Sequence, residues 1–151
     1  MRTIKVSTRL IRRKSSDATQ LTARVPASAL ARRGDLLKGC LCCSGMFDLK
    51  PVRLSSRSTY VKFTDEMEQA LSAQRHLDKI NCPLIVAHGT LETPEFQRQT
   101  RDFAAAVKAS GKPVQFLVAE GYNHFEIIET LASPFGLLGR AVLEQMKLTQ
   151  V

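Results

Sequence analysis

The sequence predicts an α/β fold in which buried parallel strands alternate with helices. Short apolar runs bounded by glycine or proline occur at residues 39–45, 83–89 and 113–120, and such runs are typical of buried strands. A segment with apolar residues at helical spacing separates the second run from the third. The order strand, helix, strand, helix favours a parallel sheet with right-handed crossovers. The 151 residues are enough for one domain with a substantial core.

The first expected strand, residues 39–45, carries three of the four cysteines. Cys40 and Cys42 lie two apart, so on a strand they share one face while Cys43 points to the other. The C-x-C-C spacing lacks the paired C-x-x-C of a zinc site, and no histidine pair completes it. We therefore interpret these residues as reduced thiols of a core strand, which fits a cytosolic compartment, and we expect no metal.

Helices are expected after the first and second strands. A turn-rich segment around Pro51 should contain short elements at most. Thr64 is a candidate N-cap, followed by two acidic residues, for a short helix that ends near Ser72. Thr93 and Pro94 should open a longer helix as its N-cap and first helical residue. The apolar face of this helix is formed by residues at helical spacing: Phe96, Phe103, Ala104 and Val107.

The third strand is followed by two more expected helices. Asn123 and Glu126 form a capping pair for a helix through about Ala132. A proline then interrupts the chain, and a final helix is expected from about Gly136 to Met146. Three strands are few for an independent doubly wound domain, so the sequence is interpreted as the end of a longer fold.

The net charge of +8 is concentrated at the N-terminus. Residues 1–38 contain ten Lys and Arg against two acids, whereas residues 39–151 contain twelve of each sign. The balanced remainder has no basic face to follow a phosphate backbone, which argues against nucleic-acid binding. Because its apolar residues show no sustained period, segment 1–34 is expected to be disordered or weakly packed. A mitochondrial presequence and a misread or truncated gene are the less favoured interpretations of this segment.

Membrane and secreted classes are not favoured by the sequence. No apolar run approaches the roughly 20 residues that a membrane span requires. The N-terminus lacks the apolar stretch of a secretory signal. We expect a cytoplasmic protein with no membrane partner.

Two loops that follow neighbouring strands hold the residues best suited to chemistry. Glu92 follows the second strand and His124 follows the third. Loops at the carboxyl ends of adjacent parallel strands converge on one edge of a sheet. A carboxylate and a histidine brought together there form the pair that orients an imidazole as a general base. His88 is expected to be a packed strand residue and His76 a surface residue.

The motifs around these residues resemble a known superfamily. HGTLETPEFQRQTRDF, followed by EGYNHFEIIETL, is similar to the last third of α/β-hydrolases of the esterase and kynurenine-formamidase (arylformamidase)-like branch. The resemblance covers about residues 35–147, so residues 35–151 are expected to be a partial α/β-hydrolase domain. It implies the C-terminal portion of that parallel sheet with flanking helices. It also implies Glu92 as the acid, where Asp is usual, and His124 as the histidine of a Ser-His-acid triad.

The nucleophile of that superfamily has no counterpart in this sequence. The G-x-S-x-G elbow and the glycine-rich oxyanion loop occur nowhere in the 151 residues. Ser44 stands in a suggestive place, but Cys42 and Met46 occupy the positions that require glycine, so we interpret it as an ordinary strand-end serine. No nucleophile is therefore assigned, and no cofactor or metal is implied. The chain alone is expected to be nearly or wholly inactive.

Three hypotheses about function follow. The first is a serine hydrolase shortened by truncation or a shifted reading frame, whose full-length relatives cleave small carboxylic esters or aryl-formamide and amide bonds. The alternative is a non-catalytic remnant that acts as a binding or interaction module through a sheet edge. The least favoured is a nucleic-acid binder that uses the basic segment 1–38.

Overall fold

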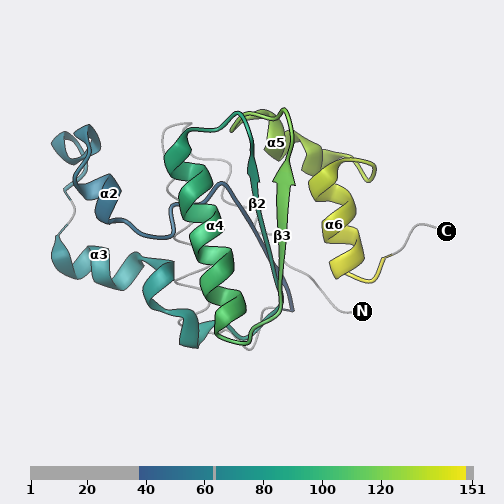
Figure 1. The fold of residues 1–151 in the computed structure, drawn as a ribbon, viewed down its shortest axis with the longest axis horizontal. Coiled ribbons are helices and arrows are strands. Elements are labelled where there is room, and N and C mark those ends of the chain that lie inside the picture. The colour runs from purple at the N-terminus through teal and green to yellow at the C-terminus, as the bar shows by residue number, and fades with distance from the viewer. Residues whose placement is uncertain (1–37, 63, 149–151) are drawn as a thin grey trace.

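The computed structural model describes residues 38–62 and 64–148, which form a three-stranded sheet flanked by helices (Figure 1). The expectations for residues 1–34 lie outside this range. The strands are β1 (Cys40–Cys43), β2 (Leu84–Gly89) and β3 (Val114–Ala119). The helices are α2 (Lys50–Arg53), α3 (Asp65–Leu71), α4 (Pro94–Ala109), α5 (Glu126–Glu129) and α6 (Leu137–Gln145). Short 3₁₀ turns occupy Ser56–Thr59, Ala73–Arg75, Leu77–Lys79 and Thr130–Ala132.

The sheet is parallel, with strand order β1-β2-β3. In β1 the register runs from Cys40 opposite Leu84 to Cys43 opposite Ala87. In β3 it runs from Val114 opposite Leu84 to Ala119 opposite Gly89. The predicted α/β architecture with a parallel sheet and flanking helices is confirmed.

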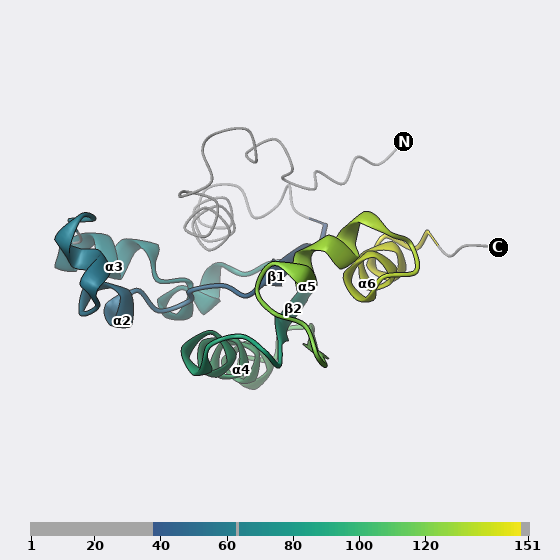
Figure 2. The same cartoon turned by 90° about the horizontal axis from the view of Figure 1, so that it is seen from above.

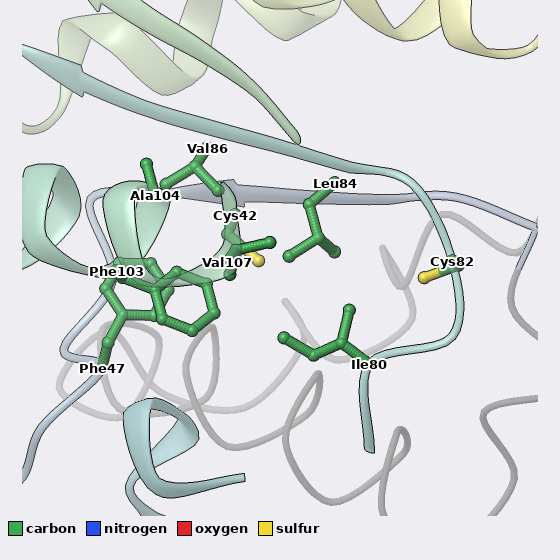
Figure 3. Close-up of a cluster of buried hydrophobic side chains, with 9 residues drawn as sticks. All are labelled: Cys42, Phe47, Ile80, Cys82, Leu84, Val86, Phe103, Ala104 and Val107. Atoms are coloured by element: carbon green, nitrogen blue, oxygen red, sulfur yellow. The ribbon is translucent and has the colours of Figure 1, made fainter. Parts of the chain in front are cut away.

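The pleat of β2 divides the core into two layers. Leu84 and Val86 face α4, where they pack with Phe103 and Val107 (Figure 3). Ala87 points to the opposite face, in the cluster that contains residues of α5 and α6, Ile127 and Leu138. Figure 2 shows α4 on one side of the sheet and α5 and α6 on the other. Burial on both faces explains why β2 is a continuous apolar run rather than an alternating one.

The cysteines of β1 alternate between these two layers, as expected from their spacing. The sulfurs of Cys40 and Cys42 lie 3.7 Å apart on the α4 side, and Cys43 packs on the opposite side. All four cysteines are free. Burial raises the pKa of Cys43 and of Cys82 to about 11, so both are neutral thiols at pH 7.

The local signals at helix ends are largely confirmed. The hydroxyl of Thr64 accepts a hydrogen bond from the Met67 amide at 3.2 Å, and α3 ends at Leu71, next to Ser72. Thr93 is the N-cap residue of α4, but its side chain makes no capping hydrogen bond. Among the described residues, no helix has both the length and the apolar character needed to cross a bilayer.

Asn123 and Glu126 form the expected capping pair. The side chain of Asn123 accepts from the Glu126 amide at 3.0 Å, and the Glu126 carboxylate accepts from the Asn123 amide at 3.1 Å. The helix itself is shorter than predicted, because α5 ends at Glu129 and continues only as a 3₁₀ turn to Ala132.

The segment between β1 and β2 is stabilised by an ionic network. The carboxylate of Glu68, on α3, is buried and accepts from Arg53 at 2.5 Å and also from Arg75. Arg53 pairs in addition with Asp65 at 2.7 Å. The two guanidinium groups compensate the burial of one carboxylate, and they join α2, α3 and the 3₁₀ turn that follows.

Candidate active site

Three chain segments meet at the carboxyl edge of the sheet, one after each strand. Ser44 follows β1, Glu92 lies in the loop between β2 and α4, and His124 lies between β3 and α5. Because the strands are parallel and in register, their ends bring all three residues to one edge. The structure therefore places Glu92 and His124 in neighbouring loops, as their sequence positions indicated.

Glu92 is the centre of this cluster, and its two oxygens have different partners. Its Oε2 lies 3.1 Å from Nδ1 of His124. Its Oε1 accepts from the Gly89 amide at 2.9 Å and from the hydroxyl of Ser44 at 2.5 Å. The residue is 6% exposed, so water contributes little to the solvation of its carboxylate. The protein supplies the hydrogen bonds that a buried carboxylate requires.

The ionisation state of Glu92 depends on its burial and on its hydrogen bonds, which shift its pKa in opposite directions. Burial by itself would raise the pKa of the carboxyl. The hydrogen bonds from His124, Ser44 and Gly89 favour the charged form, and together they hold the pKa of Glu92 below its ordinary value. Glu92 is therefore a carboxylate at neutral pH.

The orientation of the His124 ring follows from the charge of Glu92. A carboxylate only accepts hydrogen bonds, so Nδ1 of His124 donates, and Nε2 is the acceptor of the neutral ring. Among the described residues, no group forms a hydrogen bond with Nε2. The ring packs against Phe96 at a centroid distance of 4.6 Å and against the edge of Phe125 at 5.5 Å. The side chain is 25% exposed, so a fixed imidazole presents an unoccupied nitrogen near the surface.

The loops of Glu92 and His124 are held together by their backbones. A Cβ atom on Gly89 would lie 2.1 Å from the carbonyl oxygen of Tyr122, so only glycine fits at the end of β2. The Leu91 amide donates to the same carbonyl at 3.1 Å, and the Gly121 amide donates to the hydroxyl of Thr90 at 2.9 Å. These contacts set the separation of the acid from the histidine.

Ser44 belongs to this cluster, which the sequence did not reveal. It has φ 52°, in the left-handed region, and is 3% exposed. Its amide donates to the Ala87 carbonyl at 2.8 Å, while its hydroxyl donates to Glu92. The sequence offered one signal, a serine followed by glycine directly after a buried strand, and this signal does not identify the partner of the hydroxyl.

The other histidines lie apart from the Glu92–His124 pair. His88 is buried on β2, with Nδ1 3.2 Å from the Gly89 carbonyl and without a hydrogen bond at Nε2. Nε2 of His76 lies 2.8 Å from the Gln69 carbonyl, in the segment between β1 and β2. In the part of the chain that the structure describes, no cluster of three or more His, Cys, Asp or Glu side chains is arranged to hold a metal ion.

Comparisons with known proteins find relatives of similar sequence and solved structures of similar fold. No family model matches the chain. The kynurenine formamidase of Danio rerio is 29% identical over 115 residues, which are 73% of this chain and 39% of that protein. The crystal structure of a candidate thioesterase from a Silicibacter species aligns with a TM-score of 0.67 and 22% identity, over 77% of this chain and 45% of the other. An acylaminoacyl peptidase of Pyrococcus horikoshii gives a TM-score of 0.64 and 20% identity, over 83% of this chain and 22% of the other.

Each of these proteins is longer than the part that matches. The chain spans about two fifths of the length of the curated relative. The structural similarity extends over 77% and 83% of the present chain for the two solved structures. The chain has the α/β-hydrolase fold, it is similar in sequence to kynurenine formamidases, and its partial coverage fits the C-terminal portion of that fold.

Proposed function

We propose that Glu92 and His124 are the acid and the base of a Ser-His-acid triad, and that this chain supplies them to the hydrolysis of carboxylic esters or aryl-formamide and amide bonds. The observation that carries the proposal is the geometry of the pair. Oε2 of Glu92 lies 3.1 Å from Nδ1 of His124, and Nε2 has no hydrogen-bond partner among the described residues. The substrate class is suggested by the similarity to kynurenine formamidase.

In the proposed reaction, Nε2 of His124 takes the proton of a serine hydroxyl while the serine oxygen attacks the acyl carbon. The protonated ring then gives that proton to the leaving alcohol or amine, and an acyl-serine ester remains. Water, deprotonated by the same nitrogen, hydrolyses this ester and regenerates the serine. The ionised Glu92 stabilises the imidazolium in both steps, which supports its assignment as the acid.

The serine of this reaction is proposed to lie in a part of the hydrolase that this sequence does not contain. No G-x-S-x-G segment occurs among the 151 residues. Ser44 does not replace it, because its hydroxyl donates to Glu92 and is buried. The isolated chain is therefore expected to hydrolyse neither short aryl esters nor N-formyl aromatic amines, and a fluorophosphonate probe is expected to leave Ser44 unlabelled.

A chimera tests the proposal. The part of the Danio rerio kynurenine formamidase that aligns with this chain is replaced by the matching residues of this chain. We expect measurable hydrolysis of an N-formyl aromatic amine, and a loss of at least about a hundredfold in kcat for His124→Ala, since proton transfer contributes about that much or more. His76→Ala, a histidine outside the pair, is the matched control. A chimera that melts cooperatively but has no His124-dependent activity would refute the assignment.

The alternative is a non-catalytic module that binds a partner through a sheet edge. In its favour, β1 pairs only with β2 among the described residues, so its other edge has no strand partner there. An unpaired edge is a template for an added strand. An inactive but folded chimera, together with a defined homodimer or heterodimer of the native chain in sedimentation, would favour this alternative.

A further inference from the structure

We propose that Ser44 is a positioning residue, whose hydroxyl holds Oε1 of Glu92 so that Oε2 faces His124. The inference rests on the proposed function, because it assigns a role within the Glu92–His124 pair. The hydroxyl lies 2.5 Å from Oε1, and Oε2 lies 3.1 Å from the histidine nitrogen. The hydroxyl of Ser44 thus donates to the carboxylate oxygen of Glu92 that does not contact His124.

The terminal torsion of a glutamate side chain is soft, and rotation about it exchanges the places of the two oxygens. A single donor at Oε1 would leave the carboxylate plane free to turn. Here Oε1 has two donors, the hydroxyl of Ser44 and the amide of Gly89 at 2.9 Å. These donors come from the ends of two different strands, so they define the plane of the carboxylate as well as its position.

The backbone of Ser44 supports a role for the side chain. Its φ of 52° lies in the region that disfavours residues with a Cβ atom, and glycine would adopt it without strain. The amide of the residue donates to the Ala87 carbonyl at 2.8 Å, so the position is held by the sheet. A serine at a place suited to glycine is explained by the contribution of its hydroxyl to Glu92.

The surroundings indicate positioning rather than attack. The hydroxyl of Ser44 donates to the carboxylate and makes no hydrogen bond with His124, and the residue as a whole is 3% exposed. The Cys43 thiol lies 3.4 Å away, and burial raises its pKa to about 11, so it adds no charge beside Glu92 at pH 7. His124 is the ionisable partner that contacts the carboxylate within the described residues.

Nuclear magnetic resonance of the isolated chain tests the inference without an activity assay. Ser44→Gly removes the hydroxyl and suits the positive φ, so this variant should fold; Ser44→Cys retains the shape with a weaker donor. Carboxyl ¹³C shifts report the titration of Glu92, and ring ¹⁵N shifts report which nitrogen of His124 carries the proton. Ser56→Gly, at an exposed serine, is the matched control.

We expect Ser44→Gly to raise the titration midpoint of Glu92 by about one pH unit, as befits the loss of one hydrogen bond to a charged group. The Nδ1 proton of His124 should exchange faster with solvent, and Ser44→Cys should lie between the parent and Ser44→Gly. An unchanged midpoint and an unchanged His124 tautomer in Ser44→Gly would overturn the inference. The companion variant Glu92→Gln separates this inference from the proposed function. If the ring ¹⁵N shifts of His124 are unchanged in Glu92→Gln, the proposed Glu92–His124 pair is wrong. If they change, the pair is supported whatever the result for Ser44→Gly.

Discussion

Gly89→Ala should separate the two loops that carry Glu92 and His124. A Cβ atom at residue 89 would lie 2.1 Å from the Tyr122 carbonyl oxygen, whereas the shortest ordinary non-bonded distance between carbon and oxygen is about 3.3 Å. One backbone must therefore move by about 1 Å. The hydrogen bond from the Leu91 amide to the same carbonyl is 3.1 Å long, so a movement of this size disrupts it. The bond between Glu92 and His124 bridges the same two loops and should lengthen with it.

We expect Gly89→Ala to lower the free energy of unfolding by about 2–4 kcal/mol, from overpacking together with the lost hydrogen bond. Urea unfolding measures this change, and the ¹⁵N shifts of His124 report the loss of the defined tautomer. Gly111→Ala is the control, since no atom lies within 4 Å of the Cβ position of residue 111; its φ of 75° adds a backbone strain that Gly89 lacks, so the comparison works against the steric argument. If Gly89→Ala costs no more than Gly111→Ala and leaves the His124 tautomer unchanged, the steric argument is wrong.

Three further predictions concern stability. The pKa of Glu92 is lower in the folded state than in the unfolded state, so ionised Glu92 adds to the free energy of unfolding. This contribution is complete above the ordinary glutamate pKa of about 4.3 and is lost as the pH falls through the lowered folded-state pKa. In urea unfolding, the stability difference between the parent and Glu92→Gln should accordingly shrink between pH 7 and pH 3; a constant difference would contradict this. Phe103→Ala removes the ring stacked at 4.0 Å on Phe47 and should cost about 3–5 kcal/mol, and a loss under 1 kcal/mol would show that the cluster is loosely packed. Thr64→Ala removes the acceptor of the Met67 amide and should cost about 1 kcal/mol, whereas no change would mean that α3 starts without its cap.

The features that the sequence predicted well are those encoded by neighbouring residues. The apolar run of β2 ends at Gly89, as its composition indicated. The Thr64 cap and the Asn123–Glu126 pair depend on residues three apart, and both form. The placement of Glu92 near His124 required one further rule, the convergence of loops at the carboxyl edge of a parallel sheet.

The features that were missed depend on residues far apart in the chain. The hydroxyl of Ser44 donates to Glu92 across 48 positions, and no local pattern encodes that contact. The helix that begins at Glu126 gives way to a 3₁₀ turn where the hydroxyl of Thr130 accepts from the Leu138 amide of α6, an interaction set by packing. The disorder or weak packing expected of segment 1–34 from its composition and its lack of a sustained apolar period lies outside the described residues and stays a prediction.

The pairing of β2 with β3 has a consequence for the distance between the acid and the base. Leu84 lies opposite Val114 and Gly89 opposite Ala119, so the two strands end at the same level. A shift of two residues, the smallest that keeps each side chain on its own face, would displace one loop along the strand axis by about 6.6 Å. The bond between Glu92 and His124 could not survive such a displacement, because it is 3.1 Å long. The main-chain hydrogen bonds between β2 and β3 thus fix the distance between Glu92 and His124. The apolar residues that decide which face of each strand is buried also fix this register, so they determine the geometry of the site at the sheet edge.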